Sequence, residues 1–381
     1  MYIPQKQLEN LRIAVRPGKV TVLYGARRTG KTTLLYEFLK KTVETPYLLV
    51  SGEDITVQNY LASRSIEKLK AFVGKNQLLV VDEAQQVPQI GLNLKLIVDH
   101  IPNISVIATG SSAFDLARNI GEPLTGRMTT LKLYPLAQME ISQNEARHQT
   151  DANLESRLIY GSYPEVVLTP DNRTREQYLK EIVASYLYKD ILELDGIRHS
   201  GKINRLLQLI AFQIGREVSY TELAGSLGMS KNTVERYLDL LEKAFVLQKL
   251  SGFSRNLRSE ITKNGRYYFQ DNGIRNALIN NFNPLQLRDD VGRLWENYLV
   301  MERLKMQAYL GQQANNYFWR TYRQQELDFV EERGGNLFGY EIKWGHGRVK
   351  PPTEWQAAYP KAKFTLINGE NYLEFIGADN P

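Results

Sequence analysis

The first 150 residues alternate short apolar runs, rich in β-branched residues, with longer stretches that have a helical spacing of apolar positions. The short runs predict β-strands, and the longer stretches predict helices. Strands that alternate with helices are typical of a mostly parallel sheet, so we expect an α/β fold. The five predicted strands are Val20–Tyr24, Pro46–Val50, Leu78–Val81, Ser105–Thr109 and Thr129–Leu133.

The remainder of the chain has three further patterns. Residues 151–200 have the spacing of helices, and residues 201–270 predict several helices followed by a short β-rich end, Gly265–Phe269. Residues 271–381 return to mixed helix and strand, with a hairpin signal at Gly334–Asn336. We therefore predict four segments. They are an α/β domain at 1–150, a helical connection or lid at 151–200, a helical module at 201–270 and a mixed domain at 271–381.

Composition narrows the class of protein. The chain has 381 residues, of which 43% are hydrophobic, and it has no cysteine. Disulfides, thiolate zinc sites and cysteine nucleophiles are therefore excluded. Because no apolar run approaches the ~20 residues that cross a bilayer, we expect no membrane partner. The first residues lack the pattern of a secretory signal, so a cytoplasmic location is expected.

The most specific chemical motif is GARRTGKT, which begins at Gly25 between a predicted strand and a predicted helix. It fits G-x-x-x-x-G-K-[ST], a loop whose backbone amides surround phosphate groups. Lys31 is expected to reach the β- and γ-phosphates, and the Thr32 hydroxyl is expected to ligate Mg2+. A plain glycine-rich turn is the alternative. The predicted ATP contacts are Gly25, Ala26, Arg27, Arg28, Thr29, Gly30, Lys31, Thr32 and Thr33.

Two adjacent acids follow the buried run Leu78–Val81. Ligands of parallel sheets bind at the carboxyl ends of the strands, where these acids are expected to lie. We predict that Asp82 holds Mg2+ and that Glu83 polarises the water that attacks the γ-phosphate. Such a pair favours an ATP hydrolase over a small-molecule kinase. The alternative is an ordinary strand end.

Two further features lie near this predicted site. The strand ISVIATGSS ends in hydroxyl residues, and Thr109, Ser111 or Ser112 could place a hydroxyl between the acids and the γ-phosphate. Arg127 precedes the last predicted strand, where an arginine can act on the nucleotide of a neighbouring subunit. This role predicts a homo-oligomer, whereas a structural ion pair is the alternative for Arg127.

These motifs together resemble the AAA+ ATPases of bacteria and archaea that carry a C-terminal domain of long-unassigned function. The resemblance rests on GARRTGKTT, LLVVDEAQ, ATGSSA, LTGR and LYPL, and extends through YGSYPEVVL, YYFQDNGIRNAL and LWENYLV. It implies a P-loop core with strand order 5-1-4-3-2, a helical connection, a winged helix and a restriction-endonuclease-like fold. It places Ser111 or Ser112 at the sensor position, and it leaves Arg157, Arg173 and Arg175 as alternatives for a second sensor.

The segment 196–270 carries 12 basic and 6 acidic residues, an excess equal to the net charge of the whole chain, +6. Its run TELAGSLG predicts a helix closed by Gly228, and Ser230 is a suitable N-cap for the next helix. This pattern indicates a helix-turn-helix, with Phe245–Leu250 and Arg266–Phe269 as a wing. A protein-docking module or a rigid lid is the alternative. The predicted contacts to double-stranded DNA are Lys231, Asn232, Thr233 and Arg236.

The last segment has the residue types of a metal-dependent nuclease. Asp328 lies in the predicted strand LDFV, and Glu341 and Lys343 lie in the next strand, in the arrangement PD-(D/E)xK. Strand alternation lets these side chains converge if the register agrees. Two carboxylates would then hold Mg2+, with Lys343 orienting water and Glu296 as a further ligand or general acid/base. A nuclease-like fold kept only for binding is the alternative.

The sequence thus predicts an Mg2+-dependent ATPase whose nucleotide state controls DNA-binding and nuclease-like domains. The rival interpretation is a nucleotide-dependent switch that binds proteins and cuts nothing.

Overall fold

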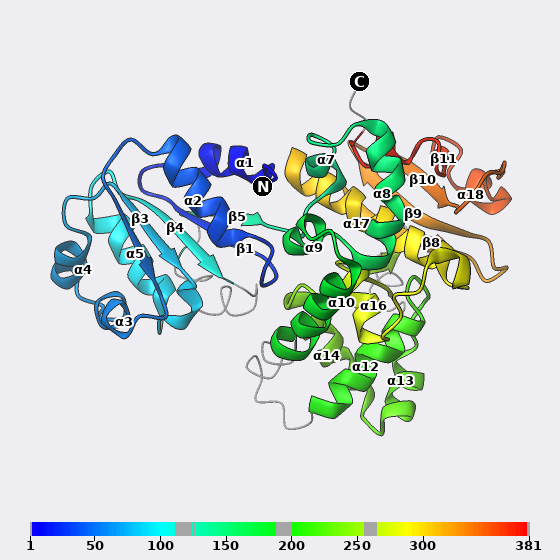
Figure 1. The fold of residues 1–381 in the computed structure, drawn as a ribbon, viewed down its shortest axis with the longest axis horizontal. Helices are drawn as coiled ribbons and strands as arrows, with labels where there is room; N and C mark the ends of the chain where they lie inside the picture. The colour runs from blue at the N-terminus through cyan, green and yellow to red at the C-terminus, as the bar shows by residue number, and fades with distance from the viewer. Residues whose placement is uncertain (1, 111–123, 125, 188–199, 255–264, 379–381) are drawn as a thin grey trace. The chain divides into compact units, whose positions relative to one another are not determined.

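The computed structural model describes residues 2–110, 124, 126–187, 200–254 and 265–378. These residues form two compact units, each with its own core (Figure 1). The first comprises residues 2–135 with 243–245, and the second comprises residues 136–242 and 246–381. In the described part of the chain, no helix is both long and apolar enough to cross a membrane.

The first unit contains a five-stranded parallel sheet in the order β2-β3-β4-β1-β5. Read from the other edge, this is the order 5-1-4-3-2 that the resemblance implied. The observed strands differ from the predicted ones by at most one residue at either end. Their bounds are β1 Val20–Tyr24, β2 Tyr47–Ser51, β3 Leu78–Asp82, β4 Ser105–Gly110 and β5 Met128–Lys132.

Helices cover both faces of this sheet, which explains why its central strands are apolar at consecutive positions. Leu79 and Val81 of β3 pack on one face, whereas Leu78 and Val80 pack on the other. The first face is covered by α3 Ile55–Leu61, α4 Ile66–Val73 and α5 Ile90–His100, and the second by α1 Gln7–Ala14 and α2 Lys31–Thr42. A short 3-10 turn, η1 Ala84–Gln86, follows β3.

The second unit begins with helices. Those after residue 150 agree with the predicted helical spacing of 151–200 in the part that the structure describes, whereas those that begin at residues 138 and 147 start within the predicted α/β domain. These helices are α7 Gln138–Ile141, α8 Arg147–Tyr160, α9 Pro164–Leu168, α10 Asn172–Glu181 and the π-helical segment η4 Ile182–Leu187. Three further helices follow: α12 Ser200–Phe212, α13 Tyr220–Leu227 and α14 Lys231–Lys243. The later helices are α16 Asn272–Leu278, η5 Leu285–Leu287, α17 Val291–Leu310, α18 Thr353–Ala358 and α19 Tyr372–Phe375.

A six-stranded mixed sheet, ordered β11-β10-β9-β8-β6-β7, completes this unit. The antiparallel pair β6/β7 was predicted as a wing, and β6 also pairs in parallel with β8. An isolated hairpin is only marginally stable in water, and here a larger sheet supports it. The predicted boundary after residue 270 therefore falls inside one sheet. Strand bounds are β6 Leu247–Gly252, β7 Arg266–Phe269, β8 Asn315–Arg320, β9 Glu326–Arg333, β10 Asn336–Ile342 and β11 Lys363–Ile367.

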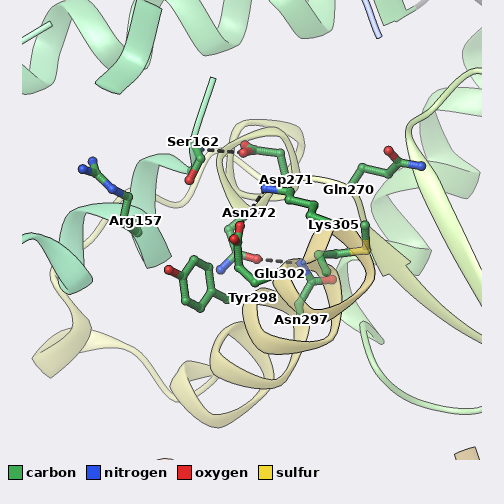
Figure 2. A pocket seen from close by; sticks show the side chains of 11 residues that line it. Arg157, Ser162, Gln270, Asp271, Asn272, Asn297, Tyr298, Glu302 and Lys305 are labelled. Carbon is green, nitrogen blue, oxygen red and sulfur yellow. Dashed lines mark hydrogen bonds and ion pairs between the residues drawn. The ribbon is translucent and has the colours of Figure 1, made fainter. Parts of the chain in front are cut away.

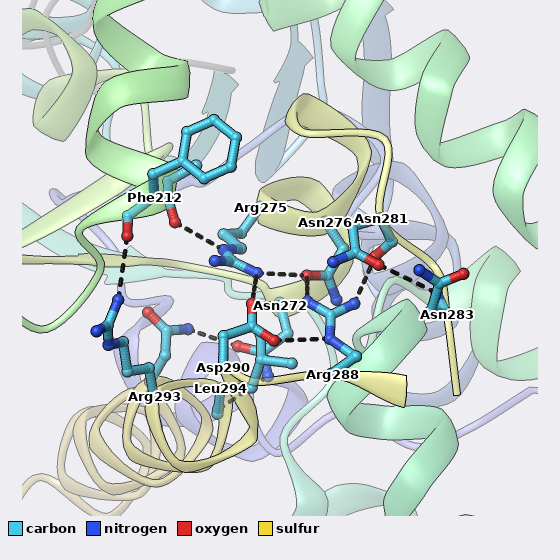
Figure 3. Close-up of polar contacts among 12 residues, drawn as sticks. Phe212, Asn272, Arg275, Asn276, Asn281, Asn283, Arg288, Asp290, Arg293 and Leu294 are labelled. Carbon is cyan, nitrogen blue, oxygen red and sulfur yellow. Dashed lines mark hydrogen bonds and ion pairs between the residues drawn. The ribbon is translucent and has the colours of Figure 1, made fainter. Parts of the chain in front are cut away.

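A buried polar network joins three helices of the second unit (Figure 3). Arg275 of α16 donates to the carbonyl of Ala211 at 2.9 Å and pairs with Asp290, the residue before α17. Arg288 binds the same carboxylate at 2.8 Å. Although burial opposes it, the bonds from Arg288 and Arg275 lower the pKa of Asp290. The network fixes the start of α17 against the end of α12 and the middle of α16.

Candidate functional site

The loop from β1 to α2 has the backbone that phosphate binding requires. At Gly25, a Cβ atom would lie 2.0 Å from the carbonyl oxygen of Leu133, so only glycine fits. Gly30 has φ 95°, a left-handed conformation that L side chains rarely adopt. The loop is held by the Thr29 hydroxyl, which donates to the Ala26 carbonyl at 2.9 Å, and by Gln5, which donates to the Thr29 carbonyl at 3.0 Å. The N-terminus of α2 follows directly, and its unpaired amides favour anions.

Lys31, the first residue of α2, turns back over this loop. Its side chain is buried, and its ammonium donates to the carbonyls of Gly25 at 2.9 Å and Ala26 at 3.0 Å. Burying a positive charge is costly unless an anion pairs with it. A phosphate group bound between the loop and Lys31 would supply that anion. Lys31 therefore lies over the loop, and its contact with the β- and γ-phosphates stays a prediction.

The ends of β3 and β4 bring two acids and a hydroxyl together. Thr32 donates to Asp82 at 3.0 Å, and the Thr109 hydroxyl donates to the other oxygen of the same carboxylate. The backbone amide of Glu83 donates to Thr109 at 3.1 Å. Of the three hydroxyl candidates, Thr109 therefore contacts both acids, whereas Ser111 and Ser112 lie outside the described residues.

Glu83 occupies a constrained position. Its backbone is left-handed, with φ 50°, and a side chain at Gly52 would come within 2.4 Å of its carbonyl oxygen. Its carboxylate accepts a hydrogen bond from Gln85 at 2.5 Å. Sequence reasoning missed Gln85, although the motif residues DEAQ place it two positions after the acid.

Arg127 pairs with Asp99 of α5 at 2.5 Å in the single chain, and its side chain is 43% exposed. This is the structural ion pair that was the alternative for Arg127, and action on a neighbouring subunit stays a prediction. The second-sensor alternatives lie in the other unit. Arg157 binds Glu145 at 2.8 Å, Arg175 binds Ser156 at 2.9 Å, and Arg173 is exposed.

The local features of the predicted helix-turn-helix are present. Gly228 ends α13 in a left-handed conformation with φ 58°, and Ser230 accepts a hydrogen bond from the Thr233 amide at 3.1 Å. Val234, Tyr237, Leu238 and Leu241 are buried. Lys231, Asn232 and Arg236 are exposed and Thr233 is half-buried, and contact of these four with DNA stays a prediction.

The carboxylates predicted for a nuclease converge in the second unit. Tyr340 pairs with Phe329 across β9 and β10, so the next position brings Glu341 beside Asp328. Asp328 accepts from the Ile342 amide at 2.9 Å, and Lys343 pairs with Glu341 at 2.7 Å. Glu296 of α17 accepts from Tyr268 at 2.7 Å.

Arg266 of β7 lies among these acids, which sequence reasoning did not foresee. Its guanidinium is 2.7 Å from Glu326, 3.6 Å from Asp328 and 3.9 Å from Glu296. The sequence feature that could have indicated Arg266 is its position as the one charged residue of the strand RYYF. We refer to Glu296, Glu326, Asp328 and Glu341, with Arg266 and Lys343, as the carboxylate cluster.

Burial and mutual repulsion perturb the titration of the carboxylate cluster. Burial, then the charge of Asp328, raises the pKa of Glu296 to about 8. Burial also raises the pKa of Asp328 and of Glu341. Among the residues that the structure describes, however, no three acidic, histidine or cysteine side chains are placed to hold a metal ion. The donor chemistry fits a divalent cation, but this placement does not.

Polar side chains line a second, small cavity in the same unit (Figure 2). Asp271 accepts from the Ser162 amide at 2.7 Å, and Lys305 pairs with Glu302 at 2.7 Å. The cavity between them has a volume of about 10 Å3, enough for one water molecule. Lys305 also donates to the carbonyl of Leu136, and Glu302 accepts from the amide of Gln138. The site therefore anchors the segment that enters this unit.

Three family models match successive parts of the chain. Residues 17–142 match a model described as AAA domain, which confirms the prediction of an AAA-type domain at that level. Residues 151–285 and 291–378 match two domains of unknown function, DUF8612 and DUF4143.

Similar proteins occur in distant organisms. An uncharacterized protein of Mycobacterium tuberculosis is 28% identical over 337 residues, covering 87% of this chain and 72% of its own length. An uncharacterized protein of Methanocaldococcus jannaschii is 25% identical, covering 84% and 74%.

Two solved structures align weakly. They are the replication initiator DnaA bound to AMPPCP and single-stranded DNA and the Drosophila ORC bound to DNA. The first has a TM-score of 0.31 at 17% identity and covers 62% of this chain and 85% of that one. The second has a TM-score of 0.28 at 14% identity and covers 72% and 85%.

Proposed function

We propose that this protein binds ATP with Mg2+ and hydrolyses it. The observation that carries the proposal is the position of Lys31 over a glycine loop, beside Thr32 and Asp82 in hydrogen-bond contact. The match of residues 17–142 to the AAA domain supports it. A glycine loop with a buried lysine and two acids at the carboxyl ends of parallel strands favour a nucleotide site over a structural turn.

Each residue has a role that its position allows. Lys31 and the loop amides bind the β- and γ-phosphates, and Thr32 and Asp82 would hold Mg2+ through hard oxygen donors. Bound Mg2+ would neutralise charge on the phosphates. Glu83 accepts a proton from the attacking water, and Thr109 orients both acids through its contacts with Asp82 and Glu83. Gln85 holds the Glu83 carboxylate.

Phosphate release from Mg-ATP tests the proposal. We expect Lys31→Ala to lose ATP binding in calorimetry, and Glu83→Gln to bind ATP with hydrolysis reduced by about 100-fold or more. Lys40→Ala, an exposed change in the same helix, is the matched control and should behave as wild type. Transfer of the γ-phosphate to a small molecule instead of water would point to a kinase.

We infer further that the nucleotide state controls the binding of double-stranded DNA by the second unit. The basic excess of residues 196–270 and the exposed start of α14 support this. Binding should weaken steeply with salt and should stimulate ATP hydrolysis. A protein-binding switch without nucleic-acid activity predicts neither effect.

The carboxylate cluster supports nuclease activity as a second candidate function. The specific observation is that the β9/β10 register brings Glu341 beside Asp328, with Lys343 and Glu296 on adjoining elements. Asp328→Ala or Lys343→Ala should abolish Mg2+-dependent cleavage by the pure protein. If the wild type cleaves neither DNA nor RNA, the rival switch is favoured.

A further inference from the structure

We propose that Arg266 is a built-in counter-cation that competes with divalent metal ions for the carboxylate cluster, so that metal binds only when its guanidinium withdraws. The inference rests on the nuclease function proposed for this cluster and concerns its regulation. It also accounts for a disagreement between sequence and structure, because the acids of a metal site converge here without assembling one.

The guanidinium of Arg266 occupies the space between the acids. Its Nη1 atom is 3.6 Å from Asp328 and 3.9 Å from Glu296, while Nη2 donates to Glu326 at 2.7 Å. The side chain is only 5% exposed and lies 4.6 Å above the ring of Phe318. Packing and three carboxylates thus fix a positive charge where a metal would have to contact the same oxygen atoms.

The charges of the cluster do not balance around this arginine. Four carboxylates face Arg266 and Lys343, while Tyr268 donates to Glu296 and Arg320 approaches Glu326 at 4.0 Å. Such a group of buried carboxylates has the oxygen chemistry that divalent cations prefer. A cation can approach from solvent, since the side chains of Glu326 and Lys343 are 44% and 52% exposed.

Competition follows from the shared oxygens. A guanidinium and a divalent metal cannot both lie against Asp328 and Glu296 without strong repulsion. Arg266 belongs to β7, and β7 pairs with β6 of the predicted wing. Displacement of this strand would therefore carry the arginine away from the acids.

Direct binding of Mn2+ tests the proposal without nucleic acid or nucleotide. The full chain would carry Thr32→Ala and Asp82→Asn, so that the candidate nucleotide site contributes no metal binding. Free Mn2+ is followed by its electron paramagnetic resonance signal. We expect Arg266→Met to bind Mn2+ at least tenfold more tightly than this parent, and we expect addition of Asp328→Asn to remove the gain.

Two controls separate charge competition from other causes. Arg320→Met removes a neighbouring arginine that contacts Glu326 and Glu217, and should leave Mn2+ affinity at the parent level. Arg266→Lys keeps the charge and should keep the affinity low. An equal gain in either control would overturn the proposal. If Arg266→Met does not fold by circular dichroism, Arg266→Gln, which keeps a donor toward Glu326, replaces it with the same expectation.

The outcomes distinguish this inference from the functions proposed above. If the parent binds Mn2+ as tightly as Arg266→Met does, Arg266 does not compete with the metal. That result overturns this inference but is compatible with a metal-dependent nuclease. Absence of Mn2+ binding from every variant overturns both. ATP hydrolysis depends on neither result.

Discussion

At the scale of single residues, the loop from Gly25 to Thr32 can be recognised in the sequence because its requirements are local, and phosphate binding by this loop stays a prediction. Gly25, Gly30, Lys31 and Thr32 lie within eight consecutive positions, and each has a backbone or side-chain requirement that few residue types meet. Asp82 and Glu83 could also be recognised in the sequence. They follow a buried strand directly, and ligands of parallel sheets bind at the carboxyl ends of the strands.

Replacement of Gly25 by alanine should abolish ATP binding. The new methyl group would lie 2.0 Å from the Leu133 carbonyl and would force the loop away from β5. We expect calorimetry to detect no binding at concentrations that saturate the wild type. Gly292→Ala, where the added methyl group meets open space, is the control. Normal affinity in the Gly25 variant would show that the loop tolerates a different path.

The sequence alone does not decide which hydroxyl residue lies beside Asp82 and Glu83. Thr109, Ser111 and Ser112 are equally plausible from composition, and only the length of β4 decides that Thr109 lies beside Asp82. The two serines fall outside the described residues, so a role for Ser111 stays a prediction.

Replacement of Thr109 by valine should reduce kcat for ATP hydrolysis by about 10- to 100-fold while leaving nucleotide affinity nearly unchanged. Valine keeps the volume but removes the hydroxyl that contacts Asp82 and Glu83. Thr129→Val, at an exposed position of β5, should retain full activity. Normal kcat in Thr109→Val would show that the Thr109 hydroxyl does not orient Asp82 and Glu83 for hydrolysis.

At the scale of elements, local pattern predicted the strands of the first sheet and the helices α13 and α14 almost residue by residue. It could not predict that β6 pairs with β8, because these strands are more than sixty residues apart and their register depends on tertiary packing. The same limit hid Arg266, whose partners Glu296, Asp328 and Glu326 come from two distant elements.

Replacement of Asp290 by asparagine should lower the free energy of unfolding by about 3 kcal/mol at pH 7, because two arginines lose a shared partner. The folded-state pKa of Asp290 is lowered, so its stabilisation is present above the unfolded pKa near 3.9 and is lost as pH falls through the folded value. The difference between variant and wild type should therefore shrink below about pH 4.

Chemical denaturation at a series of pH values measures this effect. The exposed change Glu235→Gln in α14 is the control and should alter stability little at any pH. A difference for Asp290→Asn that stays constant into strong acid would mean that packing, rather than charge, explains the loss.

At the scale of the whole molecule, the two units divide the proposed chemistry. The AAA-type unit holds the proposed nucleotide residues, and the second unit holds both the predicted helix-turn-helix and the carboxylate cluster. Motifs and charge in the sequence predict nucleotide contacts in the first unit and DNA and metal contacts in the second, and these contacts stay predictions. The sequence predicted a domain boundary after residue 270 because a change of pattern does not reveal a shared sheet.

If Arg127 acts on the nucleotide of a neighbour, mixing two inactive variants should restore activity. Arg127→Ala subunits would bind ATP, and Lys31→Ala subunits would supply the arginine. We expect phosphate release to recover in part when these two variants are mixed. Mixing Arg127→Ala with a variant that carries both Lys31→Ala and Arg127→Ala should restore none. Full activity of Arg127→Ala alone would confine this residue to its ion pair with Asp99.

The shared sheet has a practical consequence for dissection of the chain. A fragment that stops after β7 would leave one side of β6 with open amide and carbonyl groups, a template on which other chains can add strands. Such a fragment should precipitate or form mixed aggregates even though its helices are sound. Isolation of the predicted helix-turn-helix for binding work therefore calls for the entire stretch from 136 onward, not for an excised module.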